Sequence, residues 1–114
     1  MKPFRFSIPT ILLGVTFAVP LYAADCTVKI LDQNDKVMVQ ETICAPGAGS
    51  PMLKRPMRVV HYIKGTTYKR TYEDGSTETV TFKDGETTIL DIAKPYSYVN
   101  VGKTEAHMVS VAIK

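Results

Sequence analysis

The stretch that decides the fold runs from Met57 to Ile92 and reads MRVVHYIKGTTYKRTYEDGSTETVTFKDGETTILDI. It contains two Asp-Gly pairs, Asp74-Gly75 and Asp84-Gly85, each between runs of β-branched and aromatic residues. Asp-Gly tolerates the positive φ values of a tight hairpin turn, so the stretch predicts a meander of antiparallel strands. Gly65 marks a third expected reversal of the chain.

Two-residue turns would determine the register of this meander, because each strand then pairs with the next one. The predicted partners across the three turns are His61 and Tyr68, Arg70 and Thr79, and Val80 and Ile89. The face that carries Val59, Ile63 and Tyr68 is the better core candidate. The opposite face, with Arg58 and Tyr62, is expected to be partly exposed.

Residues 1–23 are typical of an export signal. A basic start precedes an apolar run of 14 residues, 6–19, and small residues follow at Ala23 and Ala24, either of which suits cleavage. The run is shorter than the roughly 20 residues that span a bilayer, so we expect no stable membrane anchor after cleavage. The remainder, residues 24–114, is predicted to form a single β-rich domain in the periplasm or the extracellular medium.

The only two cysteines, Cys26 and Cys44, are predicted to form a disulfide. An even number of cysteines in an exported chain is typical of disulfide bonding. They lie at the open ends of a predicted hairpin, whose strands at 27–31 and 37–43 flank a cluster of turn formers. Closing a loop of this length stabilises a fold by about 3 kcal/mol in the chain-entropy model.

Two further strands are predicted at 96–101 and 107–113, and a loop rich in proline and glycine, 45–51, precedes the meander. In the last strand, the alternating face that begins at His107 is expected to cover the meander. The predicted fold class is therefore all-β. We expect a small antiparallel sandwich or partly open barrel of about seven or eight strands, with the central meander at 57–92.

Charge is distributed unevenly along the chain. The net charge of +3 falls to +1 (12 basic minus 11 acidic side chains) when the two basic residues of the signal segment are removed. No acidic residue lies between Glu41 and Glu73, whereas acids dominate from Glu73 to Asp91. This segregation predicts either ion pairs between neighbouring strands, each worth up to about 1 kcal/mol, or a bipolar surface that steers a charged partner.

Catalytic motifs are missing from the sequence, which has no HExxH, no GxSxG and no glycine-rich phosphate loop. The two histidines, His61 and His107, fall on predicted strands, and no spacing joins them to a nucleophile. The prediction is a protein that is not an enzyme and uses no cofactor.

A soft-metal site is the alternative chemistry, because thioether and imidazole groups bind Cu(I). The candidate ligands of such a periplasmic copper-binding protein are Met57, His61, His107 and Met108. Met57 and His61 share a strand face but lie about 13 Å apart at 3.3 Å per residue. His107 and Met108 are adjacent and point to opposite faces, so a site would need ligands from several strands.

The leading prediction is an exported protein-binding module, such as an envelope accessory, inhibitor or immunity-type factor. Its expected partner is another envelope or secreted protein, and the low net charge argues against nucleic acid. Basic residues next to a tyrosine are of the kind enriched in protein interfaces. The candidate contact residues are Lys54, Arg55, Arg58, Tyr62 and Lys69.

Overall fold

A computed structural model describes residues 24–114, which form β-strands joined by turns and loops. The nine strands are β1 (Thr27–Gln33), β2 (Val37–Cys44), β3 (Gly49–Leu53), β4 (Arg58–Lys64), β5 (Thr67–Tyr72), β6 (Thr77–Thr81), β7 (Thr87–Leu90), β8 (Tyr96–Asn100) and β9 (Ala106–Ile113). The predicted all-β class is confirmed, with nine strands in place of seven or eight. The predicted signal segment lies outside the described residues, and none of those residues forms a helix long and apolar enough to cross a membrane.

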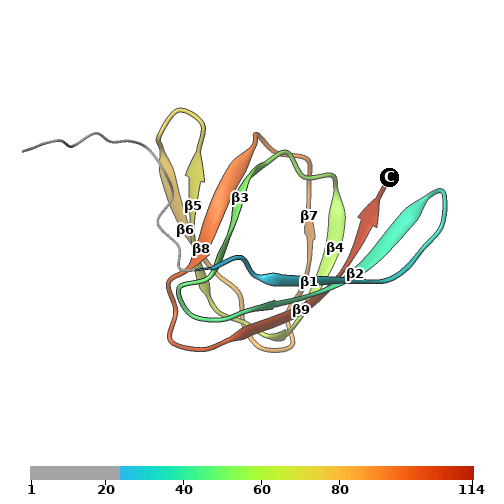
Figure 1. The fold of residues 1–114 in the computed structure, drawn as a ribbon, viewed down its shortest axis with the longest axis horizontal. Coiled ribbons are helices and arrows are strands. Elements are labelled where there is room, and N and C mark those ends of the chain that lie inside the picture. The colour runs from blue at the N-terminus through green and yellow to red at the C-terminus, as the bar shows by residue number, and fades with distance from the viewer. Residues whose placement is uncertain (1–23) are drawn as a thin grey trace, which may run out of the picture.

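The strands form two antiparallel sheets that face each other as the walls of an open barrel (Figure 1). One sheet has the order β1-β2-β9-β4-β7, and the other has the order β3-β8-β5-β6. The predicted first hairpin is confirmed, since β1 pairs with β2 from Thr27 opposite Ile43 onward. A disulfide joins Cys26 to Cys44 at the open end of this hairpin, as predicted.

Within the predicted meander, only β5 and β6 form a hairpin. Gly75 adopts a φ of +87° in the turn between them, which is the role expected of Asp-Gly. The turn is longer than two residues, because Tyr72 N donates to Ser76 O at 2.9 Å. Arg70 consequently pairs with Glu78, and the predicted pairing with Thr79 is wrong by one residue.

The other two predicted turns connect the two sheets. β4 and β5 lie in different sheets, and so do β6 and β7. The predicted pairs of His61 with Tyr68 and of Val80 with Ile89 are therefore wrong. β4 pairs instead with β7 and β9. An Asp-Gly pair permits a sharp bend, but it does not specify which strand the chain meets afterwards.

The two crossings between the sheets pass side by side and bond to each other. Gly85 N donates to Tyr62 O at 2.7 Å, and Gly65 N donates to Asp84 Oδ1 at 2.8 Å. A side chain at Gly65 would collide with the backbone of Phe82. Glycine is required there because two chain segments approach closely.

The prediction that the His107 face of β9 covers the meander is also wrong. The inward positions of β9 are the alternate ones, Ala106, Met108, Ser110 and Ala112, all of which are buried. His107 and the positions in step with it point to the outer surface. Three of the four inward side chains are small, so β9 leaves space between the sheets.

The end of the barrel near the disulfide, which we call the closed end, is held by a buried amide. Asn100 is only 1% exposed. Its Nδ2 donates to Cys44 O at 2.9 Å and to Thr104 O at 3.0 Å. Its Oδ1 accepts from Thr66 Oγ1 at 2.7 Å and from Gly102 N at 2.9 Å. One side chain thus satisfies four polar groups on three chain segments: the end of β2, Thr66 and the loop 102–104.

Candidate ligand-binding cavity

A cavity of about 540 Å³ lies between the two sheets. Most of its wall is apolar or aromatic, and polar side chains enter from β4, β5 and the segment after β3. The aromatic residues are Tyr62, Tyr68, Phe82, Tyr96 and Tyr98, and the arginines are Arg55, Arg58 and Arg70. A cavity of this size with apolar walls and few convergent polar groups is typical of a small-molecule site.

Aromatic rings form the inner part of the cavity, towards the closed end. Tyr62 stacks on Phe82 with ring centroids 4.3 Å apart and an interplanar angle of 9°. Tyr68 meets the edge of Phe82 at 6.3 Å and Tyr98 at 4.9 Å. Because Tyr62 comes from one sheet and Tyr68 and Tyr98 from the other, the rings link the two walls.

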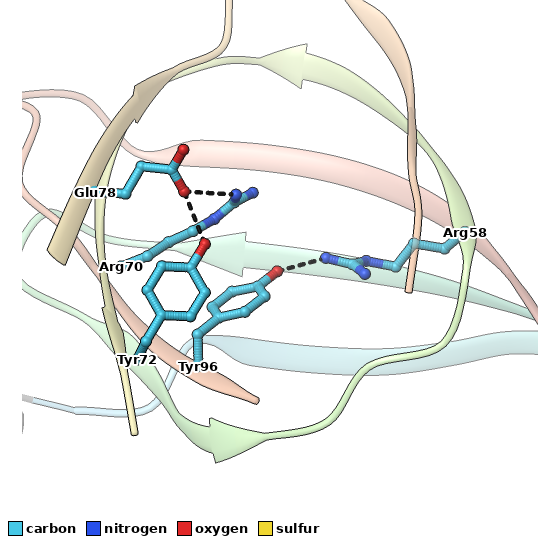
Figure 2. Close-up of polar contacts among 5 residues, drawn as sticks. All are labelled: Arg58, Arg70, Tyr72, Glu78 and Tyr96. Atoms are coloured by element: carbon cyan, nitrogen blue, oxygen red, sulfur yellow. Dashed lines mark hydrogen bonds and ion pairs between the residues drawn. The ribbon is translucent and has the colours of Figure 1, made fainter. Parts of the chain in front are cut away.

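The mouth of the cavity, at the opposite end, is built around Tyr96 (Figure 2). Arg58 Nη2 donates to Tyr96 Oη at 2.7 Å. The guanidinium of Arg70 lies 4.8 Å from the centre of the Tyr96 ring and 3.5 Å from Glu78 Oε1. Glu78 also accepts a hydrogen bond of 2.7 Å from Tyr72 Oη. Arg58 and Arg70 therefore reach the same ring from opposite sheets.

Arg55 completes the mouth from the segment between β3 and β4. Its guanidinium lies 4.3 Å from the ring centre of Tyr96 and 5.2 Å from that of Tyr98. It donates to Ser50 Oγ at 2.7 Å and to backbone oxygens, among them that of Leu53 at 3.1 Å. These bonds hold the guanidinium against the aromatic wall without neutralising its charge.

The three arginines concentrate positive charge in a partly dry site. Within residues 24–114, Arg70 is the only one of them that forms an ion pair, and its partner Glu78 has half of its side chain exposed. Burial lowers the pKa of Arg55 below its ordinary value; Tyr96 and Tyr98 partly offset this, and the charges of Arg58 and Arg70 act in the same direction as burial. The mouth is therefore ready to accept a negative charge.

The phenols of Tyr62, Tyr68 and Tyr98 remain protonated at neutral pH. Burial raises the pKa of Tyr62, Tyr68 and Tyr98 above the ordinary value of a phenol. At the mouth, the hydrogen bond to Glu78 raises the pKa of Tyr72. These hydroxyls therefore act as hydrogen-bond donors and as weak acceptors, and not as bases.

The predicted contact residues do not form one outer surface. Lys54, Arg55, Arg58 and Tyr62 line the cavity, and Tyr62 is almost completely buried. Lys69 is exposed on the opposite face of β5, because it lies between two inward positions of that strand.

Sequence reasoning missed Arg70, Tyr96 and Tyr98 as site residues. The available signal was their spacing: Tyr68, Arg70 and Tyr72 alternate along β5, and Tyr96 and Tyr98 alternate along β8. Residues two apart on a strand share a face, so the three positions on β5 and the two on β8 each predict a row of aromatic and basic groups on one face. Which face would enclose a cavity depended on the pairing of β5 with β8.

The candidate metal ligands are not brought together. His61 Nδ1 lies 2.7 Å from Thr87 Oγ1, and His107 Nε2 lies 2.7 Å from Glu41 Oε2, both on the outer face of the five-stranded sheet. Met57 is 39% exposed before β4. Of the four candidate ligands, Met108 alone lines the cavity. Across the described part of the chain, no group of three or more histidine, cysteine, aspartate or glutamate side chains is placed to hold a metal ion.

No known family matches the sequence, and no curated protein matches it either. Solved structures do match the fold. A cupin domain from Bordetella pertussis is 18% identical, with a TM-score of 0.72 over 83% of this chain and 99% of that one. A cupin protein with a double-stranded β-helix fold from Methanocaldococcus jannaschii is 14% identical, with a TM-score of 0.61 over 90% and 92%. The polyketide cyclase RemF from Streptomyces resistomycificus is 16% identical, with a TM-score of 0.56 over 90% and 80%.

Proteins of this fold are often enzymes or binders of metals or small molecules. The residues of this cavity do not fit a metal ion. Its lining within residues 24–114 offers arginine, lysine, tyrosine and two methionines, Met38 and Met108, with no histidine, aspartate or glutamate. Guanidinium groups repel a cation, and hard or borderline ions need imidazole, thiolate or carboxylate donors.

The comparisons overturn the predicted function, because cupin domains are not protein-binding inhibitor modules. The physical reason is that the basic and aromatic groups expected on an outer surface, above all Arg55, Arg58 and Tyr62, instead face a cavity. At this level of identity the likeness concerns the fold alone. The chain has the architecture of the cupin domain, a double-stranded β-helix that encloses a cavity between two antiparallel sheets.

Proposed function

We propose that this protein binds a small amphipathic organic anion in the cavity between its sheets. The observation that carries the proposal is the gathering of Arg55, Arg58 and Arg70 around the Tyr96 ring, with an acidic partner for Arg70 alone in the described part of the chain. A bound anion would supply the missing negative charge through charge-assisted hydrogen bonds, which are roughly twice as strong as neutral ones. The aromatic walls would enclose its apolar body.

We infer binding without chemical conversion. The cavity lining within residues 24–114 contains no histidine, aspartate or glutamate, the side chains that most often transfer protons in catalysis. The disulfide between Cys26 and Cys44 supports a periplasmic or secreted location, because such bonds persist in oxidising compartments. The proposal is therefore an exported carrier or sensor of a small molecule.

The test uses two dyes that differ in one charge. 1-Anilinonaphthalene-8-sulfonate carries a sulfonate, and N-phenyl-1-naphthylamine has the same rings without it. The sulfonate is expected to bind at least tenfold more tightly to the protein, measured by fluorescence titration. Arg58→Gln keeps a hydrogen-bond donor near Tyr96 but removes the charge. It should lower the affinity for the sulfonate about tenfold, since a charged hydrogen bond contributes about 1.5 kcal/mol or more, and leave the affinity for the neutral dye unchanged.

Two control variants separate the cavity from the outer surface. Lys69→Gln removes a positive charge from the outer face of β5, and Ile89→Lys alters a 68% exposed apolar position on the outer face of the five-stranded sheet. Neither should change the affinity for the sulfonate. Equal affinity of the protein for the two dyes would refute the proposed site. So would weaker binding of the sulfonate to Ile89→Lys together with unchanged binding to Arg58→Gln.

A further inference from the structure

Tyr68 carries a buried polar atom without a partner. Its side chain is 96% buried (4% exposed) and lines the cavity at its inner part. Its hydroxyl makes no hydrogen bond within residues 24–114. A buried hydroxyl without a partner costs about 1–3 kcal/mol. The neighbouring Asn100, directly opposite in β8, has all four of its hydrogen-bonding positions satisfied.

The hydroxyl of Tyr62 belongs to the same region. Tyr62 comes from the opposite sheet, and its ring stacks on Phe82 at the inner part of the cavity. The pKa of Tyr68 is raised mainly by burial and additionally by Tyr98 and Tyr62, which is consistent with hydroxyls that lie near one another. Both rings also contact Phe82, so two phenols from facing sheets border the inner part of the cavity.

The two polar regions of the cavity lie at opposite ends. Arg58 and Tyr62 are four residues apart on the inner face of β4, so their Cα atoms are separated by about 13 Å at 3.3 Å per residue. Tyr68 and Tyr72 are separated in the same way along β5. Stacked and edge-on rings line the space between them.

We infer that the ligand carries a second polar group, a hydroxyl or carbonyl, at the end opposite to its anion. This inference rests on the proposed function and specifies the ligand class: an aromatic acid with a polar substituent at the far end of its ring. The anion pairs with the arginines at the mouth, and the far group accepts hydrogen bonds from Tyr62 and Tyr68. The Tyr68 hydroxyl is covered by its neighbours, so contact with it requires a side-chain shift. Met108, which is unbranched and adaptable, lies in the cavity wall at the position paired with Tyr62.

The test compares cinnamate with 4-hydroxycinnamate by isothermal titration calorimetry. The hydroxylated acid is expected to bind about tenfold more tightly to the unaltered protein, in line with one or two neutral hydrogen bonds. In the double variant Tyr62→Phe/Tyr68→Phe this preference should fall to within twofold, while the affinity for cinnamate is retained. The single variant Tyr68→Phe should melt at the same temperature as the unaltered protein or higher, because it removes an unpaired polar atom.

The outcomes distinguish a failure of the inference about the inner polar group from a failure of the proposed anion binding. Equal affinity for both acids, or binding of the sulfonate dye with no binding of either acid, overturns the inference about the inner polar group and leaves anion binding intact. A tenfold preference that persists in the double variant overturns it as well. A lower melting temperature for Tyr68→Phe shows that the hydroxyl is already paired and also counts against it. If neither acid nor the sulfonate dye binds, the proposed function itself fails.

Discussion

The closed end and the mouth of the barrel differ in how far their buried polar groups are paired within the protein. At the closed end, Asn100 meets protein groups at both donors and both acceptor positions. At the mouth, Arg55 and Arg58 bond to neutral oxygens of the chain and keep their full charge. The difference teaches that the first region is completed by the polypeptide itself, whereas the second is completed by something that enters it.

The largest expected effect is on Asn100. Asn100→Ala removes the hydrogen bonds to the buried carbonyl of Cys44, to the part-buried carbonyl of Thr104, to a hydroxyl and to an amide, so the free energy of unfolding should fall by about 4 kcal/mol. Urea unfolding followed by circular dichroism measures the change. Ser97→Ala is the matched control, since Ser97 is equally buried on β8 but makes a single contact of 3.5 Å, and its cost should stay below about 1 kcal/mol. Equal costs for the two variants would show that the amide network does not hold this end.

The disulfide is expected to contribute slightly less. Cys26 and Cys44 are 18 residues apart, and replacing both by alanine should lower the free energy of unfolding by about 3 kcal/mol through the entropy of the unfolded chain. Thermal unfolding with and without dithiothreitol measures it. The reductant should destabilise the unaltered protein and have no effect on the double variant. Stability that is insensitive to reductant in both would contradict the expected clamp on β1.

Alkaline pH should weaken the aromatic inner part of the cavity. Burial raises the folded-state pKa of Tyr62 and Tyr68 above the unfolded value near 10. Their contribution to stability is therefore fully present below about pH 10 and is lost as pH rises towards the folded-state pKa. At about pH 10.5 the two together should cost on the order of 2 kcal/mol, measured by urea unfolding across the pH range. Burial raises the pKa of Tyr98 as well, so Tyr62→Phe should remove about a third of the measured pH dependence. An unchanged dependence would show that other groups titrate.

The smallest effect on stability is expected at the mouth, in contrast to the large effect expected at Asn100. Glu78→Gln removes the acid that pairs with Arg70 and accepts from Tyr72, at a side chain that is half exposed. The free energy of unfolding should change by no more than about 0.5 kcal/mol. The affinity for the sulfonate dye should rise about threefold, because the competing carboxylate is gone, and the pKa of Tyr72 should fall towards its ordinary value. Weaker dye binding in this variant would mean that Glu78 helps to position Arg70 for the anion.

Local patterns along the chain predicted much of the secondary structure. The first hairpin, the disulfide and the turn at Gly75 follow from turn-forming residues between β-branched runs. The turn at Gly85 also has a positive φ, yet it links two sheets instead of two paired strands. Asp-Gly therefore forms a hairpin turn in one place and a crossing between the sheets in the other. Which of the two occurs depends on the pairing of strands that are distant in the sequence.

The sequence indicated some of the residues that line the cavity, but it predicted that they lie on an outer surface. Arg55, Arg58 and Tyr62 stood out as a mixture of basic and aromatic groups, but the sequence does not say whether such a face meets solvent, a partner or a cavity. That outcome depended on β8 pairing with β5 and on β9 pairing with β4, across 24 or more residues of chain. Those pairings bring Tyr96 and Tyr98 to the arginines and turn His61 and His107 outward.

By itself the sequence determined the all-β class, the single covalent link and the positions of the sharp turns, because these depend on residues close together in the chain. The tertiary structure alone decided that β4 and β5 belong to different walls and that small side chains on β9 leave a cavity between them. A strand places every second residue on the same face, but which face is enclosed depends on its partners. The cluster of arginines around Tyr96 exists only once those partners have met.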